Sequence, residues 1–73
     1  MRLPSLKPQQ VVRILKRAGF GAARQTGSHL ILVNISAKKI VPVPIHSKDI
    51  KRGLLASIIK QSGLTNSEFL ELL

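Results

Sequence analysis

The segment from Ile40 to Ile45, IVPVPI, carries two prolines two positions apart. Its β-branched residues favour an extended strand, but proline has no backbone N–H with which to bond a neighbouring strand. Residues two apart in a strand direct their backbone groups to the same side, so Pro42 and Pro44 leave one edge without donors. That arrangement is tolerated only where the edge has no partner strand. The sequence therefore predicts an edge strand here.

Two further extended runs, Ala22–Thr26 and His29–Asn34, precede this strand. Gly27-Ser28 between them has the composition of a two-residue hairpin turn. A second turn over Ile35–Lys39 leads into the edge strand. We therefore expect an antiparallel sheet of three strands in chain order.

The register of the second hairpin decides which side chains share a face. Pairing Leu30 with Ile45 places the alternate apolar residues on one face, where helices can cover them. The same register places His29 opposite His46 on the other face, beside Arg24. A slip by one residue would turn the edge strand over and expose its valines. We therefore expect an open face that carries both histidines.

In the sequence, helices are predicted before and after the three strands. The segment Pro8–Ala18 begins with a proline, repeats apolar residues at helical spacing and ends before Gly19. A second apolar stripe, Leu54–Ile59, is followed by a stop at Gly63, and Thr65–Glu68 has the spacing of a capping box. The predicted fold class is α+β: α-β-β-β-α with a short extra C-terminal helix, the helices packed on one face of a three-stranded antiparallel sheet.

The charge of the chain is one-sided, with 12 Lys and Arg against 3 acidic residues and a formal net charge of +9. This excess favours a polyanionic partner: nucleic acid, an acidic protein or an anionic membrane surface. No apolar run approaches the ~20 residues of a membrane span, and residues 1–10 lack the apolar core of an export signal. Cysteine is absent, which excludes disulfides and fits a cytoplasmic location. We expect one small domain, residues 1–73.

Four segments together resemble the HicA family of toxins, also called YcfA-like mRNA interferases. They are ILKRAGF at Ile14–Phe20, RQTGSH at Arg24–His29, VPIH at Val43–His46, and RGLLASIIKQSGLTNSEFLELL from Arg52 to the end. The resemblance implies a fold similar to double-stranded-RNA-binding domains and an activity that cleaves or blocks mRNA. It also implies a partner antitoxin, HicB, that holds the toxin inactive, and a catalytic histidine in the Gly-Ser-His motif.

That histidine is His29. A neutral imidazole can take the proton of an RNA 2′-hydroxyl, or pass a proton to the leaving oxygen, near pH 7. Because the 2′-hydroxyl is the nucleophile, the reaction needs no metal and no other cofactor, and the few acidic and histidine side chains are too scattered to predict a metal site. His46 is a possible second proton-transfer residue, but a structural role at the strand end is the preferred interpretation, because the family assigns catalysis to the first histidine. Judged without the resemblance, His29 is an ordinary surface histidine.

The predicted RNA-binding residues surround His29 and continue into the loops: Arg24, Gly27, Ser28, Lys38, Lys39, Lys48, Lys51 and Arg52. Arg24 is the best candidate to clamp the reacting phosphate. Gly27 would let a phosphate approach, and Ser28 would donate a hydrogen bond to it. Each lysine is equally well explained as a solvated surface charge. Because Trp and Tyr are absent, bases have few rings on which to stack, and sequence preference should be weak.

Ile31 and Val33 depart from the polar, aromatic or basic residues that many family members carry after the histidine. With Arg24 and His29 they form a mixed basic and apolar surface, the predicted antitoxin interface. Two other functions remain open. One is an RNA-binding module of the same fold in which His29 is inert, and the other is a protein that binds an acidic protein and has no role with RNA. No membrane partner is expected.

Overall fold

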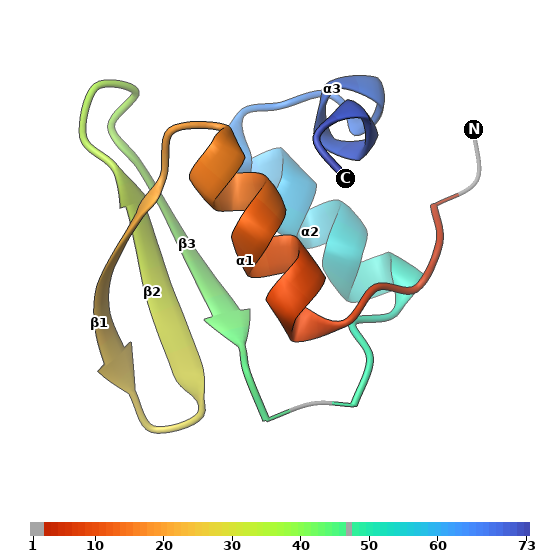
Figure 1. Cartoon of the computed structure of the whole chain (residues 1–73), viewed down its shortest axis with the longest axis horizontal. Helices are drawn as coiled ribbons and strands as arrows, with labels where there is room; N and C mark the ends of the chain where they lie inside the picture. Colours follow the sequence, from red (N-terminus) through yellow and green to blue (C-terminus); the bar gives the residue numbers. More distant parts are fainter. Residues whose placement is uncertain (1–2, 47) are drawn as a thin grey trace.

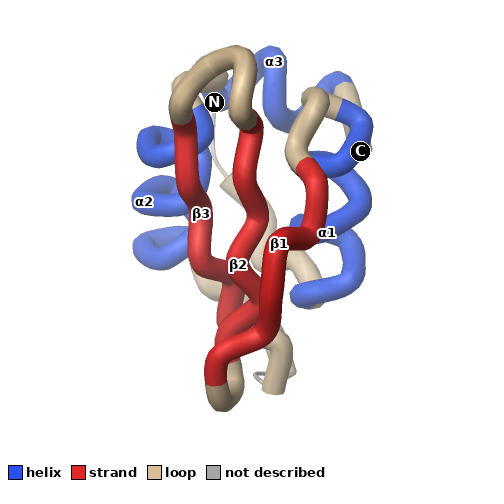
Figure 2. Tube along the Cα trace, turned by 90° about the vertical axis from the view of Figure 1, so that its left-hand side faces the viewer, coloured by secondary structure: helices blue, strands red, loops and turns tan. Residues whose placement is uncertain are grey.

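The computed structural model describes residues 3–46 and 48–73. Its elements are α1 (Pro8–Arg17), β1 (Gly21–Thr26), β2 (His29–Asn34), β3 (Lys39–Pro44), α2 (Arg52–Ser62) and α3 (Asn66–Glu71). The strands form one antiparallel sheet in the order β1-β2-β3. The helices lie on one face of this sheet, as Figure 1 shows, and the other face is open (Figure 2). The predicted fold class is confirmed.

The helix ends follow the local signals of the sequence. Gly19 has a φ of +102°, and the N–H of Phe20 donates to the carbonyl of Leu15 at 2.9 Å, which is the Schellman arrangement at the end of α1. α3 begins with the predicted capping box. There the N–H of Thr65 donates to Oε1 of Glu68 at 2.8 Å, and the N–H of Glu68 donates to Oγ1 of Thr65 at 3.1 Å.

The core lies between the helices and the inner face of β2 and β3. Its fully buried side chains are Val11, Ile14, Leu15, Leu32, Val41, Val43, Ile50, Leu55, Ile58, Ile59 and Phe69. β1 is exposed at every position and adds no side chain to this core. The sheet is therefore packed against the helices through two of its three strands.

The register of β2 and β3 differs from the prediction by two residues. Leu30 pairs with Val43, not with the residue two positions further on. The alternate apolar side chains still face the helices, but the expected histidine pair is wrong. His29 lies opposite Pro44, and His46 lies beyond the end of β3. A shift of two residues keeps the period of a strand, so the apolar pattern could not distinguish the two registers.

β3 is an edge strand, as its prolines predict. The N–H of Ile45, just after β3, donates to the carbonyl of Ser28 at 2.8 Å. Because backbone groups alternate along a strand, the odd-numbered residues of β3 direct their N–H groups toward β2. The nitrogens of Pro42 and Pro44 therefore face the free edge, and the ladder loses no hydrogen bond to either proline.

The segment before α1 is tied to the loop before α2. Leu6 and Ile50 exchange two backbone hydrogen bonds: the N–H of Ile50 donates at 2.7 Å and the N–H of Leu6 at 3.2 Å. Both side chains are buried. The sequence patterns did not predict this bridge. Within residues 3–46 and 48–73, none of the helices has the length and apolar character needed to cross a bilayer.

Candidate nucleic-acid interface

The turn between β1 and β2 is held in a defined shape. Gly27 has a φ of +56°, and Ser28 after it has no positive φ, the pattern of a type II′ hairpin turn. Thr26 pairs with His29 across the turn, as predicted. The carbonyl of Ser28 accepts the hydrogen bond from Ile45, which fastens the turn to the chain that follows β3.

His29 is exposed on the open face, at the first position of β2. Its Nδ1 lies 3.4 Å from Oγ of Ser28, which is long for a hydrogen bond. In the tautomer in which Nδ1–H donates to this oxygen, Nε2 keeps its lone pair and can accept a proton. The hydroxyl of Ser28 can equally donate to Nδ1, so this contact alone selects neither tautomer.

Arg24 lies on the same open face as His29. It pairs with Ile31, two residues further along β2, as predicted. The ladder is regular from the turn to Arg24 and then breaks at a bulge between Ala22 and Arg24. This bulge was not predicted. Because a bulge bends its strand, the regular part of the open face ends beside Arg24.

The open face is more apolar than the sequence suggested. Ile31 and Val33 are half-buried within it. Ile40 of β3 pairs with Val33 and is 61% exposed, so it belongs to the same surface. The predicted interface did not include Ile40, although its even spacing from the two prolines of β3 places it on the same face.

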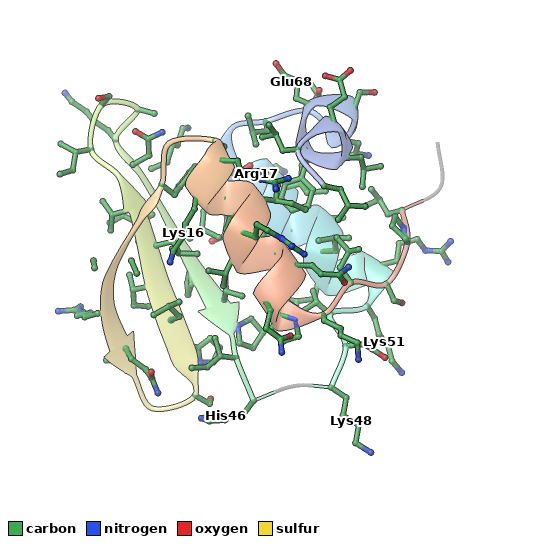
Figure 3. The ribbon with its side chains drawn as sticks, in the orientation of Figure 1. Lys16, Arg17, His46, Lys48, Lys51 and Glu68 are labelled. Carbon is green, nitrogen blue, oxygen red and sulfur yellow. The ribbon has the colours of Figure 1, made fainter. Side chains whose placement is uncertain are left out.

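The predicted RNA-binding lysines lie at opposite ends of the sheet. Lys48 and Lys51, with His46, lie at the end of the molecule where β1 turns into β2 (Figure 3). Lys38, in the turn between β2 and β3, and Lys39, the first residue of β3, lie at the other end. A strand rises by ~3.4 Å per residue, so these two lie about 17 Å from His29 along the sheet.

The last residue of the predicted site is Arg52. Arg52 is the first residue of α2 and is exposed. In the part of the chain that the structure describes, no three side chains of His, Asp or Glu gather where they could hold a metal ion.

The element order, the sheet with one covered face and the basic surface define a small α+β protein similar in fold to double-stranded-RNA-binding domains. Residues 8–64 match the model of the HicA toxin of bacterial toxin–antitoxin systems. The chain belongs to this family, and the family supports a toxin role for it. The match runs from α1 to the residue after the cap of α2 and leaves α3 outside. No curated protein matches the chain.

Proposed function

We propose that this toxin is a metal-independent endoribonuclease that cleaves mRNA, with His29 as the catalytic residue. The observation that carries the proposal is the exposed imidazole beside a glycine turn, in a member of a toxin family. A Cβ placed on Gly27 would meet no atom within 4 Å, so the turn is open to an approaching phosphate.

The chemistry follows from the position of the imidazole. Nε2 of His29 takes the proton of an RNA 2′-hydroxyl, and that oxygen attacks the adjacent phosphorus. The bond to the 5′-oxygen breaks, and this oxygen takes up a proton from water, which leaves a 2′,3′-cyclic phosphate and a 5′-hydroxyl. The guanidinium of Arg24 offsets the charge that develops on the phosphate oxygens.

Expression of the chain in bacteria is expected to arrest growth, and His29→Ala is expected to relieve the arrest. The imidazole is exposed and makes no contact with the core. The substitution should therefore remove the catalytic group without unfolding the protein. Viable counts after induction measure the effect, with immunoblots to establish equal protein levels. Arrest by the alanine variant at equal levels would show that toxicity does not depend on this histidine. RNA that is retained but not cut would favour a binding module instead.

We expect RNA binding to be mainly electrostatic. With about four to six phosphate contacts, log K should fall against log salt with a slope near −3 to −4 for a single strand. Arg24→Ala removes one contact and should flatten the slope by about 0.7. Lys60→Ala, an exposed cation in the last turn of α2, is the matched control and should leave the slope unchanged. An affinity that does not depend on salt would contradict this expectation.

We also propose that a HicB-type antitoxin covers the open face, formed by Arg24, His29, Ile31 and Val33 together with Ile40. An acidic rim around an apolar centre complements this surface, and it would block access to His29. Ile31→Asp is expected to weaken the complex at least about tenfold, because a buried unpaired carboxylate costs more than ~1.4 kcal/mol. The fold should survive, since Ile31 faces away from the helices.

Leu54→Asp is the matched control for that experiment. Leu54 is 46% exposed on α2, so the change is the same but lies in the helical layer. Calorimetric titration with the purified antitoxin measures both variants, and hydrogen exchange maps the protected amides. Protection confined to the helices, with β1, β2 and β3 unchanged, would place the antitoxin elsewhere.

A further inference from the structure

A groove of about 630 Å³ lies along α1, on the helical side of the sheet. Its floor is apolar and comes from Val12 of α1, Leu30 of β2 and Ile45 after β3. The groove stays open because no residue of β1 lines it, and every residue of β1 is exposed. Its floor is therefore apolar surface that this chain leaves partly uncovered.

The rim of the groove is basic. Arg13, Lys16 and Arg17 line it from α1, and all three side chains are exposed. They occupy positions i, i+3 and i+4, which lie on one side of a helix. Figure 3 shows Lys16 extending from α1 toward the sheet. Among the described residues that line the groove, none is acidic.

We propose that this groove binds an acidic amphipathic helix of another protein. An apolar floor between helix and sheet suits a stripe of leucine-like side chains, and Arg13 and Lys16 suit carboxylates beside the stripe. Arg17 adds positive charge to the rim, but its Nη1 already donates to the carbonyls of Leu72 and Leu73. α1 is ten residues long, which corresponds to about 15 Å, so two to three turns of a partner helix fit beside it.

The same features disfavour other occupants. Gln9 is the one neutral side chain in the described lining of the groove that can hydrogen-bond the edge of a nucleobase, and this lining has no aromatic ring on which a base could stack, so RNA would mainly use the charged rim. A second copy of the chain carries the same net charge of +9, so two copies repel each other. An acidic protein segment satisfies both the floor and the rim.

This inference goes beyond the proposed function, because the groove and His29 lie on opposite faces of the sheet. Leu30, on the groove floor, and His29 are neighbours in β2 and therefore point to opposite sides. A helix in the groove leaves the open face accessible. The groove is thus a recruitment surface that a partner occupies without blocking the histidine.

The test uses the whole chain and two labelled synthetic peptides. One carries Leu at every third or fourth position and Glu elsewhere, and the other is a scrambled peptide of equal composition. Fluorescence anisotropy is expected to show at least about tenfold tighter binding of the amphipathic peptide, a difference of ~1.4 kcal/mol. Val12→Asp should abolish this preference, and Lys16→Glu should weaken binding of both peptides. Leu54→Asp, the control on α2, should change neither.

Several outcomes would overturn the proposal. Equal binding of the two peptides would mean that charge alone attracts them, and an unchanged preference in Val12→Asp would place binding outside the groove. If Val12→Asp fails to fold in a thermal melt, Arg13→Glu and Lys16→Glu decide, because both side chains are exposed, and unchanged affinity then rejects the groove. An RNA oligonucleotide that displaces the peptide and loses affinity through Val12→Asp would identify a nucleic-acid site instead.

Discussion

His29→Ala should lower the rate of RNA cleavage by roughly 10²–10⁴-fold, the usual effect of removing one general acid or base. The imidazole is exposed beside the hairpin turn, as the proposed proton transfer requires. Single-turnover cleavage of single-stranded RNA in the presence of EDTA measures the loss. Cleavage at the wild-type rate by the variant, purified free of host nucleases, would reject the assignment of His29.

His46→Ala tests whether the second histidine takes part in the reaction. The observed register removes His46 from the position opposite His29 and leaves it beyond the end of β3. We therefore expect a much smaller loss of rate than for His29→Ala. Equal losses would instead indicate that the two imidazoles share the proton transfers.

The substrate provides a second check of the mechanism. A strand with a single 2′-deoxy residue at the cleavage site lacks the nucleophile and should remain intact at that position. Cleavage of this strand would show that the attacking group is water or a protein side chain.

Phe69→Ala is expected to destabilise the fold by about 3–5 kcal/mol, the usual cost of removing a buried phenylalanine side chain. Phe69 is fully buried and is the largest of the fully buried side chains in the described chain. It belongs to α3, which lies outside the region that the toxin family model matches. Small proteins have a total stability of ~5–15 kcal/mol, so the variant should be near the lower limit of folding. Urea denaturation followed by circular dichroism measures the change.

Leu73→Ala is the matched control on the same segment. Leu73 is 50% exposed, so its truncation should change the free energy of unfolding by less than about 0.5 kcal/mol. α3 is also held by Arg17, whose Nη1 donates to the carbonyls of Leu72 at 2.8 Å and Leu73 at 3.2 Å. If Phe69→Ala unfolds at the wild-type urea concentration, α3 does not contribute to the core in solution.

The sequence predicted the elements well, because their ends depend on local chemistry. Gly19 and the capping box of α3 act within a few residues, and the two prolines of β3 identify an edge wherever the strand lies. The register of β2 and β3 depends on their turn. There Oδ1 of Asn34 accepts the N–H of Ala37 at 3.2 Å, and Lys38 has a φ of +56°. Residues other than glycine rarely adopt this left-handed conformation, so a lysine in the sequence does not indicate it. The shape of this turn could therefore not be predicted.

The positions of two residues of the candidate site could also be predicted from local chemistry. Arg24 and His29 share the open face because the two-residue turn fixes their register. The positions of the lysines depend on the paths of the loops that carry them, and residue patterns do not show these paths. Leu30 and Ile45 were expected in the core. Both are instead half-buried in the groove along α1. How closely the sheet packs on this helix depends on the tertiary structure, and a residue pattern within one strand does not show it.

The two prolines of β3 also bear on how the protein behaves when no partner covers it. An unpaired strand edge is a template on which another chain can add a strand, and sheets that present long regular edges aggregate. On β3, the donors that an incoming strand would need are missing at Pro42 and Pro44. On the opposite edge, the bulge beside Ala22 interrupts β1 after a few regular positions. Neither edge offers a long ladder to a second copy, so the isolated toxin resists edge-to-edge aggregation while its open face remains exposed.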